Sequence, residues 1–119
     1  MFKERVQHII AQGEGVRIEF KESRSKLPSN LFETICAMLN RDGGDIVLGV
    51  DDKGVVTGVD KKKVDEIISN LVTLSNNHNK LDPPFILFPQ VYEMGDETVI
   101  HIQVPSSSQM HKSAGHIYD

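Results

Sequence analysis

The sequence predicts a single α+β domain in which about three helices pack on a mixed or antiparallel sheet. Three observations support this fold class. The chain has 119 residues, which is enough for one domain with one hydrophobic core of ordinary size. Apolar residues recur at helical spacing in three segments, and strand-like runs separate these segments. With 39% hydrophobic and 25% charged residues, the composition is typical of a globular domain.

Each helical segment has its own start or stop signal. The first helix is expected to end at Gln12-Gly13, because glycine commonly terminates helices. The second follows the break at residues 27–30, and the third follows Asp60, a residue type that caps helix N-termini. The third helix is expected to end in the polar run 75–79. The predicted apolar stripes are Phe2, Val6, Ile9 and Ile10 in the first helix, Leu31, Ile35, Met38 and Leu39 in the second, and Val64, Ile67, Ile68, Leu71 and Val72 in the third.

Two strands are predicted in the first half of the chain. Residues 16–20 alternate between apolar and polar side chains, which predicts a half-buried strand. Residues 46–50 are apolar on both sides of the pleat, so both faces of this strand should be covered. Residues 51–54 have the composition of a tight turn. They predict a hairpin in which residues 55–59 return as a strand.

A second hairpin is predicted near the C-terminus. Its strands are residues 85–92 and 98–104, joined by a turn at Gly95-Asp96. His101 alternates with inward-pointing neighbours, so it is expected on the outer face as an exposed histidine. The predicted core combines this hairpin with the other elements and consists of Ile18, Phe20, Leu31, Ile35, Met38, Ile46, Leu48, Val50, Ile67, Leu71, Ile100 and Ile102.

Several function classes are excluded by missing motifs. No apolar run approaches the ~20 residues of a membrane span, and the N-terminus lacks the apolar core of a signal peptide. Gly49 and Gly54 have P-loop spacing, but Val55 and Val56 follow them instead of lysine and a hydroxyl. The dinucleotide-binding fingerprint fails at Ile18. The five histidines show no zinc-binding spacing.

The single cysteine indicates a cytoplasmic protein. The net charge shows that the chain has no overall basic character. Cys36 cannot form an intramolecular disulfide, which fits a reducing cytoplasm, and it is expected as a buried thiol. The net charge is −4, whereas domains that bind nucleic acid tightly usually carry a basic excess or face. Basic residues do cluster at Lys61-Lys62-Lys63. This cluster is either an ordinary solvated surface run or a site that contacts another molecule.

Three short motifs in order resemble the Schlafen AlbA-like domain. They are Glu19-Phe20-Lys21-Glu22, the stretch from Ala37-Met38-Leu39-Asn40 to Gly43-Gly44, and the segment from Gly49-Val50-Asp51-Asp52 to Gly58. The resemblance covers roughly residues 10–119. Such domains occur near the N-terminus of many bacterial proteins named as transcriptional regulators or helicase-related proteins, and in the core of vertebrate Schlafens.

The resemblance implies a nucleic-acid-binding domain of a transcriptional-regulator-like protein, with DNA favoured over RNA. The implied contacts to phosphates are made by Arg17, Lys21, Arg24 and Lys26. Phosphate contacts carry no base specificity. Since the chain has no tryptophan and few other aromatic residues, base stacking is not expected to be the main binding mode.

A metal-dependent endoribonuclease of the Schlafen type is the first alternative. By resemblance, its catalytic and metal-binding residues would be Glu14, Glu19 and Asp52, with Asp52 preferred over Asp51. Such carboxylates would hold Mg²⁺ or Mn²⁺, which activates water and neutralises the phosphate. Alternatively, Glu19 pairs with a neighbouring cation and Asp51-Asp52 serves only the turn. The preferred interpretation needs no cofactor.

A second alternative is a dimerisation or docking module that does not bind nucleic acid. The negative net charge favours this interpretation and the basic cluster disfavours it. Family members usually continue beyond a last hairpin arm such as residues 111–119. Residues 1–119 are therefore interpreted as an N-terminal Schlafen AlbA-like domain of a longer protein. The expected protein partners are the missing C-terminal domain and, in a possible homodimer, a second copy of the chain.

Overall fold

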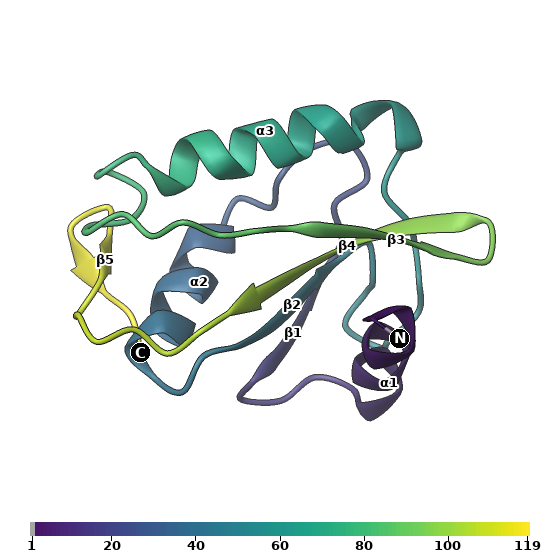
Figure 1. Cartoon of the computed structure of the whole chain (residues 1–119), viewed down its shortest axis with the longest axis horizontal. Helices are drawn as coiled ribbons and strands as arrows, with labels where there is room; N and C mark the ends of the chain where they lie inside the picture. Colours follow the sequence, from purple (N-terminus) through teal and green to yellow (C-terminus); the bar gives the residue numbers. More distant parts are fainter. Residues whose placement is uncertain (1) are drawn as a thin grey trace.

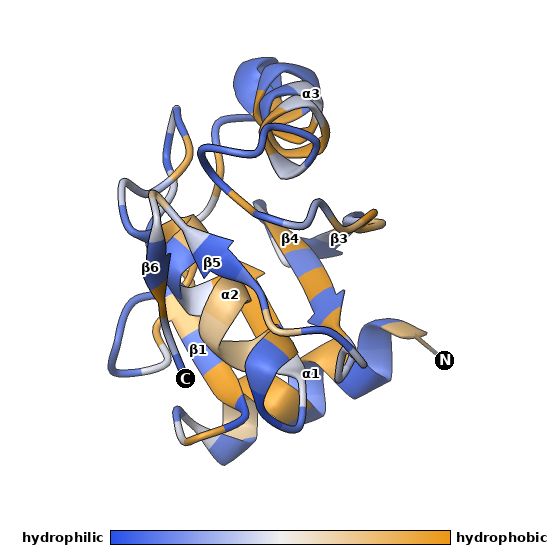
Figure 2. Cartoon of the chain, turned by 90° about the vertical axis from the view of Figure 1, so that its left-hand side faces the viewer, coloured by the Kyte–Doolittle hydropathy of each residue, from blue (hydrophilic) through white to orange (hydrophobic). Residues whose placement is uncertain are grey.

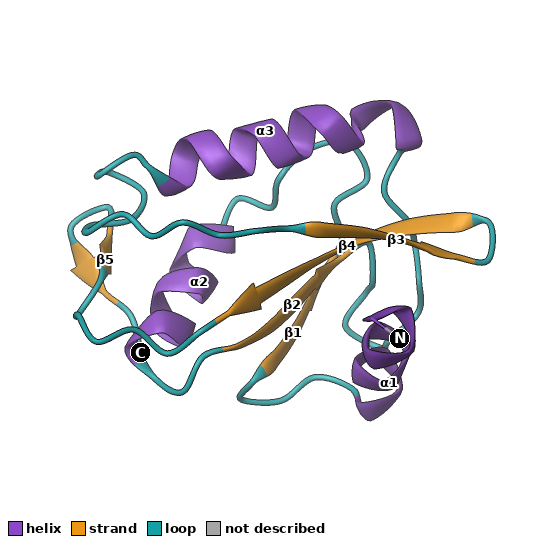
Figure 3. Cartoon of the chain, viewed as in Figure 1, coloured by secondary structure: helices purple, strands orange, loops and turns teal. Residues whose placement is uncertain are grey.

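The computed structural model describes residues 2–119, which form three α-helices on a mixed sheet (Figures 1 and 3). The helices are α1 (Phe2–Gln12), α2 (Leu31–Asn40) and α3 (Val64–Ser75), and a 3₁₀ turn, η1 (Lys61–Lys63), leads into α3. The strands are β1 (Ile18–Lys21), β2 (Gly44–Leu48), β3 (Gln90–Met94), β4 (Glu97–Val104), β5 (Lys112–Ser113) and β6 (His116–Ile117). The predicted α+β class is confirmed.

The main sheet has the strand order β1-β2-β4-β3. β1 and β2 are parallel, with α2 in the connection between them, whereas β2–β4 and β4–β3 are antiparallel. In the register, Val47 lies opposite His101 and Asp45 lies opposite Gln103. A separate two-stranded hairpin, β5–β6, packs near α2.

The sheet is covered on both faces, so the domain has two apolar clusters. α2 and α3 pack on one face, over Ile46, Leu48, Ile100 and Ile102. α1 packs on the other, where its Val6 and Ile9 join a cluster that includes Val47 and Val99. α1 and α3 accordingly lie on opposite sides of the β3–β4 strands (Figure 1). This confirms that both faces of the strand at residues 46–50 are covered.

Most predicted helical and core features are confirmed. Every predicted core residue is buried except Ile18, which is half-buried at the edge strand β1. Cys36 is buried and free. The Asp60 side chain accepts a hydrogen bond from the Lys62 amide at 3.0 Å and so caps η1. Phe2 on α1 and Val72 on α3 are exceptions to the predicted apolar stripes, since both side chains are exposed.

Three strand predictions need correction. Residues 55–59 form no strand; a single bridge between Val50 and Val56 closes the turn. β3 begins at Gln90, because the segment from residue 85 has no sheet partner before that point. Val16 lies outside β1 and is exposed. In each case the strand-like pattern in the sequence is longer than the segment that pairs with a neighbouring strand.

The prediction that His101 is exposed is wrong. Its side chain is only 7% exposed, and its Nε2 lies 2.7 Å from Asp45 Oδ1. The alternation itself is confirmed, since His101 points away from Ile100 and Ile102, and β4 shows alternating apolar and polar bands (Figure 2). The second face of β4 is nevertheless not open to solvent, because it carries α1 and its own apolar cluster.

Within residues 2–119, none of the helices has the length and apolar character required to cross a membrane.

Candidate nucleic-acid interface

The four predicted phosphate-binding residues lie along β1 and the loop after it. Arg17 precedes β1, and its exposed guanidinium donates to the Asp42 carbonyl at 2.9 Å. Arg24 and Lys26 lie in the loop after the other end of β1, and both are exposed. Neither of these two side chains has a hydrogen-bond or ion-pair partner within residues 2–119. They are therefore available to an external anion.

Lys21 differs from the other three because it is buried. Its side chain is 8% exposed, its Nζ donates to Asn30 Oδ1 at 2.9 Å, and Glu19 Oε1 lies 3.8 Å away. The alternating pattern of β1 suggested a polar, solvent-facing lysine. Lys21 already has partners inside the domain. Its charge therefore has a role in the fold, in addition to any contact with an external ligand.

The structure joins two basic segments that are far apart in the sequence. The Asp60 amide donates to the Arg24 carbonyl at 2.7 Å, which places the Arg24 loop beside η1 and its three lysines. Lys61 pairs with Glu93 at 3.5 Å and Lys63 with Glu66 at 3.7 Å. We refer to this set as the basic surface; its members are Arg24, Lys26, Lys61, Lys62 and Lys63.

Two of the three predicted metal ligands lie near each other. Glu14 Oε2 accepts a hydrogen bond from the Phe20 amide at 2.9 Å, which holds Glu14 against β1. Partial burial raises the pKa of the Glu19 carboxyl; the Lys21 ammonium lowers it, the Glu14 carboxylate raises it further, and the net shift is upward. A raised pKa at a carboxyl pair is a feature of functional sites.

The turn that carries the third predicted ligand is built by Asp51. Its Oδ1 accepts hydrogen bonds from the amides of Lys53 and Val55, both at 2.9 Å, whereas Asp52 is exposed. Within the described residues, the Asp52 carboxylate therefore has no hydrogen-bond partner, whereas that of Asp51 holds the turn. The part of the chain that the structure describes contains no group of three or more His, Cys, Asp or Glu side chains arranged to hold a metal ion. The metal assignment stays a prediction.

Glu19→Gln tests whether the ionised Glu19 carboxylate lowers the stability of the domain. Because folded Glu19 binds its proton more tightly than unfolded Glu19, its ionisation costs folding free energy. That cost is absent below the ordinary pKa of 4.5 and appears as the pH rises through the folded-state value. We therefore expect urea denaturation to show a smaller loss of stability above pH 4.5 for Glu19→Gln than for the wild type.

The matched control for this prediction is Glu22→Gln, which removes an exposed carboxyl three residues along the chain. It makes the same change of charge and leaves the Glu14–Glu19 pair in place. A Glu19→Gln variant that loses stability with pH as steeply as the wild type would contradict the assignment.

Comparison with known proteins decides the family. The model of the family described as Schlafen, AlbA_2 matches residues 14–119, nearly the whole chain. This chain belongs to the Schlafen AlbA_2 family. The match includes the three motifs and all predicted site residues. No similar sequence was found among curated proteins.

Two solved structures share the Schlafen AlbA_2 fold of this chain. One is the N-terminal domain of a protein from Nitrosomonas europaea described as ATP-dependent DNA helicase RecG-related; it has 25% identity and a TM-score of 0.64, over 83% of this chain and 71% of that one. The other is the DIP2311 protein from Corynebacterium diphtheriae, with 18% identity and a TM-score of 0.62, over 92% of this chain and 23% of that one. At 18% identity the second similarity shows the fold alone.

Two functional features were missed at the level of sequence. One is the hydrogen bond between Arg24 and Asp60, which no local pattern indicates because the two residues are far apart in the sequence. The other is the pair formed by His101 and Asp45. A signal for the pair did exist: each is a polar residue with apolar neighbours in its strand, and such residues need partners when they are buried.

Proposed function

We propose that this domain binds nucleic acid, with DNA as the favoured partner, as a module of a transcriptional-regulator-like protein. The observation that carries the proposal is the hydrogen bond from the Asp60 amide to the Arg24 carbonyl, because it assembles the basic surface. Within residues 2–119, Arg24, Lys26 and Lys62 form no ion pair. Unpaired cations on one surface are the usual means of contacting phosphates.

The similarity to a solved domain adds support. The relative from Nitrosomonas europaea is described as DNA helicase-related, and DNA is the substrate that this description implies for that protein. The fold match extends over most of both chains. We therefore extend nucleic-acid association, and DNA as its first candidate, to the present domain.

The overall charge sets the expected strength of binding. At −4, the domain as a whole repels a polyanion, so attraction must come from the basic surface at short range. Such binding is weak, insensitive to sequence and strongly dependent on salt.

The double variant Arg24→Glu/Lys62→Glu tests the basic surface. Both residues are exposed, so the variant should fold normally. We expect weaker binding to all duplex sequences. The slope of log affinity against log salt should be flatter by about 2, because each lost phosphate contact removes about 0.9. Fluorescence anisotropy with labelled duplexes at several salt concentrations measures both quantities.

Lys80→Glu, combined with Lys53→Glu, is the matched control. It makes the same charge change at exposed lysines outside the basic surface, one of them beyond the far end of α3. If the control weakens binding as much as Arg24→Glu/Lys62→Glu does, net charge rather than the basic surface governs binding. Lys21→Glu is a poorer probe, since burial of Lys21 would make it unfold the domain as well.

A metal-dependent ribonuclease is the second candidate. It is favoured by the electrostatic contact between Glu14 and Glu19 and by the raised pKa of Glu19, since a cation at this pair would relieve both. Asp52 does not form a three-carboxylate group with this pair in the described residues, so its turn would have to move toward the pair for a cation to be shared. In this case Glu19→Gln abolishes cleavage of structured RNA in the presence of Mn²⁺ and leaves RNA binding intact. RNA that remains uncut by the wild-type domain with Mn²⁺ present excludes this candidate.

A further inference from the structure

The face of the sheet that carries α1 is only partly covered by that helix. α1 packs over apolar residues of the central strands, including Val47 and Val99. On the same face of these strands, the positions two residues away from Val47 and Val99 carry polar side chains. These residues are Asp45 on β2 and His101 on β4. The polar band continues with Gln103 on β4 and with Gln90 on β3, which pairs with His101. Beyond α1, this face is therefore a polar floor.

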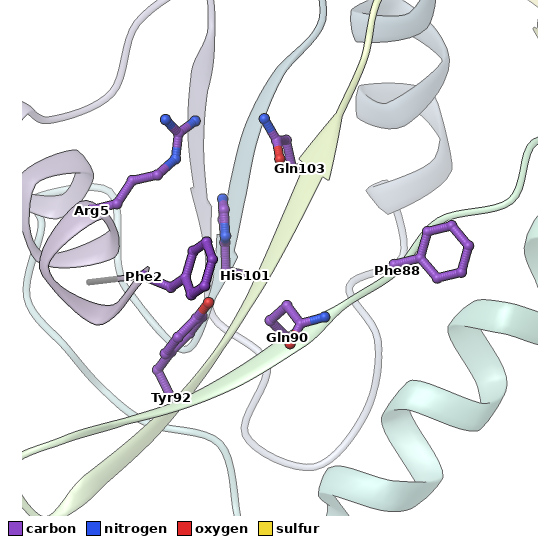
Figure 4. Close-up of a pocket in the computed structure, with 7 residues that line it drawn as sticks. All are labelled: Phe2, Arg5, Phe88, Gln90, Tyr92, His101 and Gln103. Carbon is purple, nitrogen blue, oxygen red and sulfur yellow. The ribbon is translucent and has the colours of Figure 1, made fainter.

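A hollow of about 500 Å³ lies above the polar floor (Figure 4). α1 forms one wall through Phe2 and Arg5, and Tyr92 on β3 forms another. In Figure 4, Phe2, Tyr92 and His101 are drawn toward one side of the hollow and Phe88 toward the other. The full lining consists of Phe2, Arg5, Phe88, Gln90, Tyr92, His101 and Gln103.

A charged chain beneath the hollow fixes the orientation of His101. Its Nε2 lies 2.7 Å from Asp45 Oδ1, and Arg5 Nη2 lies 3.5 Å from the same oxygen. Partial burial raises the pKa of Asp45, but the hydrogen bond and charge of His101 and the Arg5 guanidinium lower it more, so that the net shift is downward. An ionised Asp45 only accepts hydrogen bonds, so His101 Nε2 carries a proton and donates it.

Three polar groups of the hollow have no partner. His101 Nδ1 makes no hydrogen bond within residues 2–119, and it is not among the enclosed side-chain atoms that lack a partner in this part of the chain, so it is accessible from the hollow. The amide groups of Gln90 and Gln103 have no partner within the same residues. Each amide offers both donors and an acceptor. Both glutamine side chains are exposed, so their amide groups are available to a ligand in the hollow.

We infer that this hollow binds the base of an unpaired nucleotide. A nucleobase is planar and apolar on its faces, which suits the exposed Phe2 ring and the Tyr92 ring. Its edge carries both donors and acceptors, which suits the two glutamine amides and His101 Nδ1. Arg5, at the rim, is placed to contact the phosphate of the same nucleotide.

This site is distinct from the basic surface and adds to the proposed function. The basic surface contacts phosphates of any nucleic acid, whereas the hollow requires a base that is not paired. A duplex cannot present such a base without opening. The same chemistry is offered by a free mononucleotide and by a single-stranded segment, and the experiment separates these two sources.

The test observes the side-chain amide NMR signals of Gln90 and Gln103 in the ¹⁵N-labelled domain. The ligands are the four ribonucleoside 5′-monophosphates, ribose 5-phosphate, a single-stranded 12-mer and a duplex of the same sequence. We expect at least one mononucleotide and the 12-mer to shift both signals. Ribose 5-phosphate and the duplex should not shift them. Shifts with ribose 5-phosphate equal to those with mononucleotides would overturn the inference, because they would mean that phosphate alone is bound.

Variants then connect the hollow to affinity. Gln90→Ala/Gln103→Ala replaces two exposed side chains, so the fold should be retained. The loss of two amide contacts should weaken binding of the single-stranded 12-mer by about tenfold and leave duplex affinity unchanged. Gln7→Ala, an exposed glutamine of α1 outside the lining, is the control and should change neither affinity.

The two proposals fail in different ways. Amide shifts with a mononucleotide, together with no duplex binding, would support the hollow and refute the basic surface as a DNA-binding site. Salt-dependent duplex binding with no amide shifts from any mononucleotide or from the 12-mer would refute the hollow alone.

Discussion

Gly43→Ala is expected to destabilise the domain by about 3–5 kcal/mol, a large part of the 5–15 kcal/mol typical of a domain. Two effects add up at this position. Gly43 has φ +78°, a conformation that side-chain-bearing residues rarely adopt. A β-carbon there would also overlap the Val104 carbonyl oxygen and lie 2.9 Å from the Pro105 carbonyl carbon. The backbone between α2 and β2 passes too close to the end of β4 for any side chain.

Gly115→Ala separates these two effects. Gly115 has almost the same φ, +79°, but a β-carbon there would meet no atom within 4 Å. We therefore expect Gly115→Ala to cost only the conformational term, about 1–2 kcal/mol. Urea denaturation followed by circular dichroism measures both variants. Equal losses for the two variants would show that close approach to β4 contributes nothing at Gly43.

Asn40→Ala is expected to destabilise the domain by about 2–4 kcal/mol, because it leaves buried polar groups without partners. The Asn40 side chain donates to the carbonyls of His111 at 2.9 Å and Tyr118 at 2.6 Å, and it accepts from the His111 amide at 2.7 Å. His111 is fully buried. One amide group at the end of α2 thus attaches the last part of the chain to the core.

Hydrogen exchange gives this prediction a local readout. In Asn40→Ala the His111 amide should exchange faster than the amides of β2, because the C-terminal segment opens before the sheet does. Asn70→Ala is the control: Asn70 is an exposed asparagine of α3 with no partner within the described residues, and its replacement should be neutral. If His111 exchanges no faster in Asn40→Ala than in the wild type, Asn40 does not hold the segment.

These two predictions give a structural meaning to one of the family motifs. The stretch from Ala37 to Gly44 was recognised as a pattern typical of Schlafen AlbA-like domains, without a physical reason for each residue. Asn40 proves to hold the C-terminal segment, and Gly43 permits the close contact with β4. In this motif, Asn40 and Gly43 therefore have identifiable roles in the fold.

The sequence by itself was sufficient for the fold class, the three helices and the core. Helical and strand periodicities follow from backbone geometry within a few residues, so the buried side of α2 and the face of β4 that carries Ile100 and Ile102 could be predicted directly. The burial of Cys36 and the capping of η1 by Asp60 also follow from neighbours in the sequence. The family motifs could be recognised for the same reason, since each one is short and continuous.

Only the tertiary structure decided which polar residues meet. His101 and Asp45 form a pair because β2 and β4 are adjacent, and Arg24 joins η1 through a single backbone hydrogen bond. Lys21 is buried because Asn30, at the start of α2, reaches it. These contacts depend on strand order, register and the path of loops, which arise from the packing of the whole chain and leave no periodic trace in the sequence.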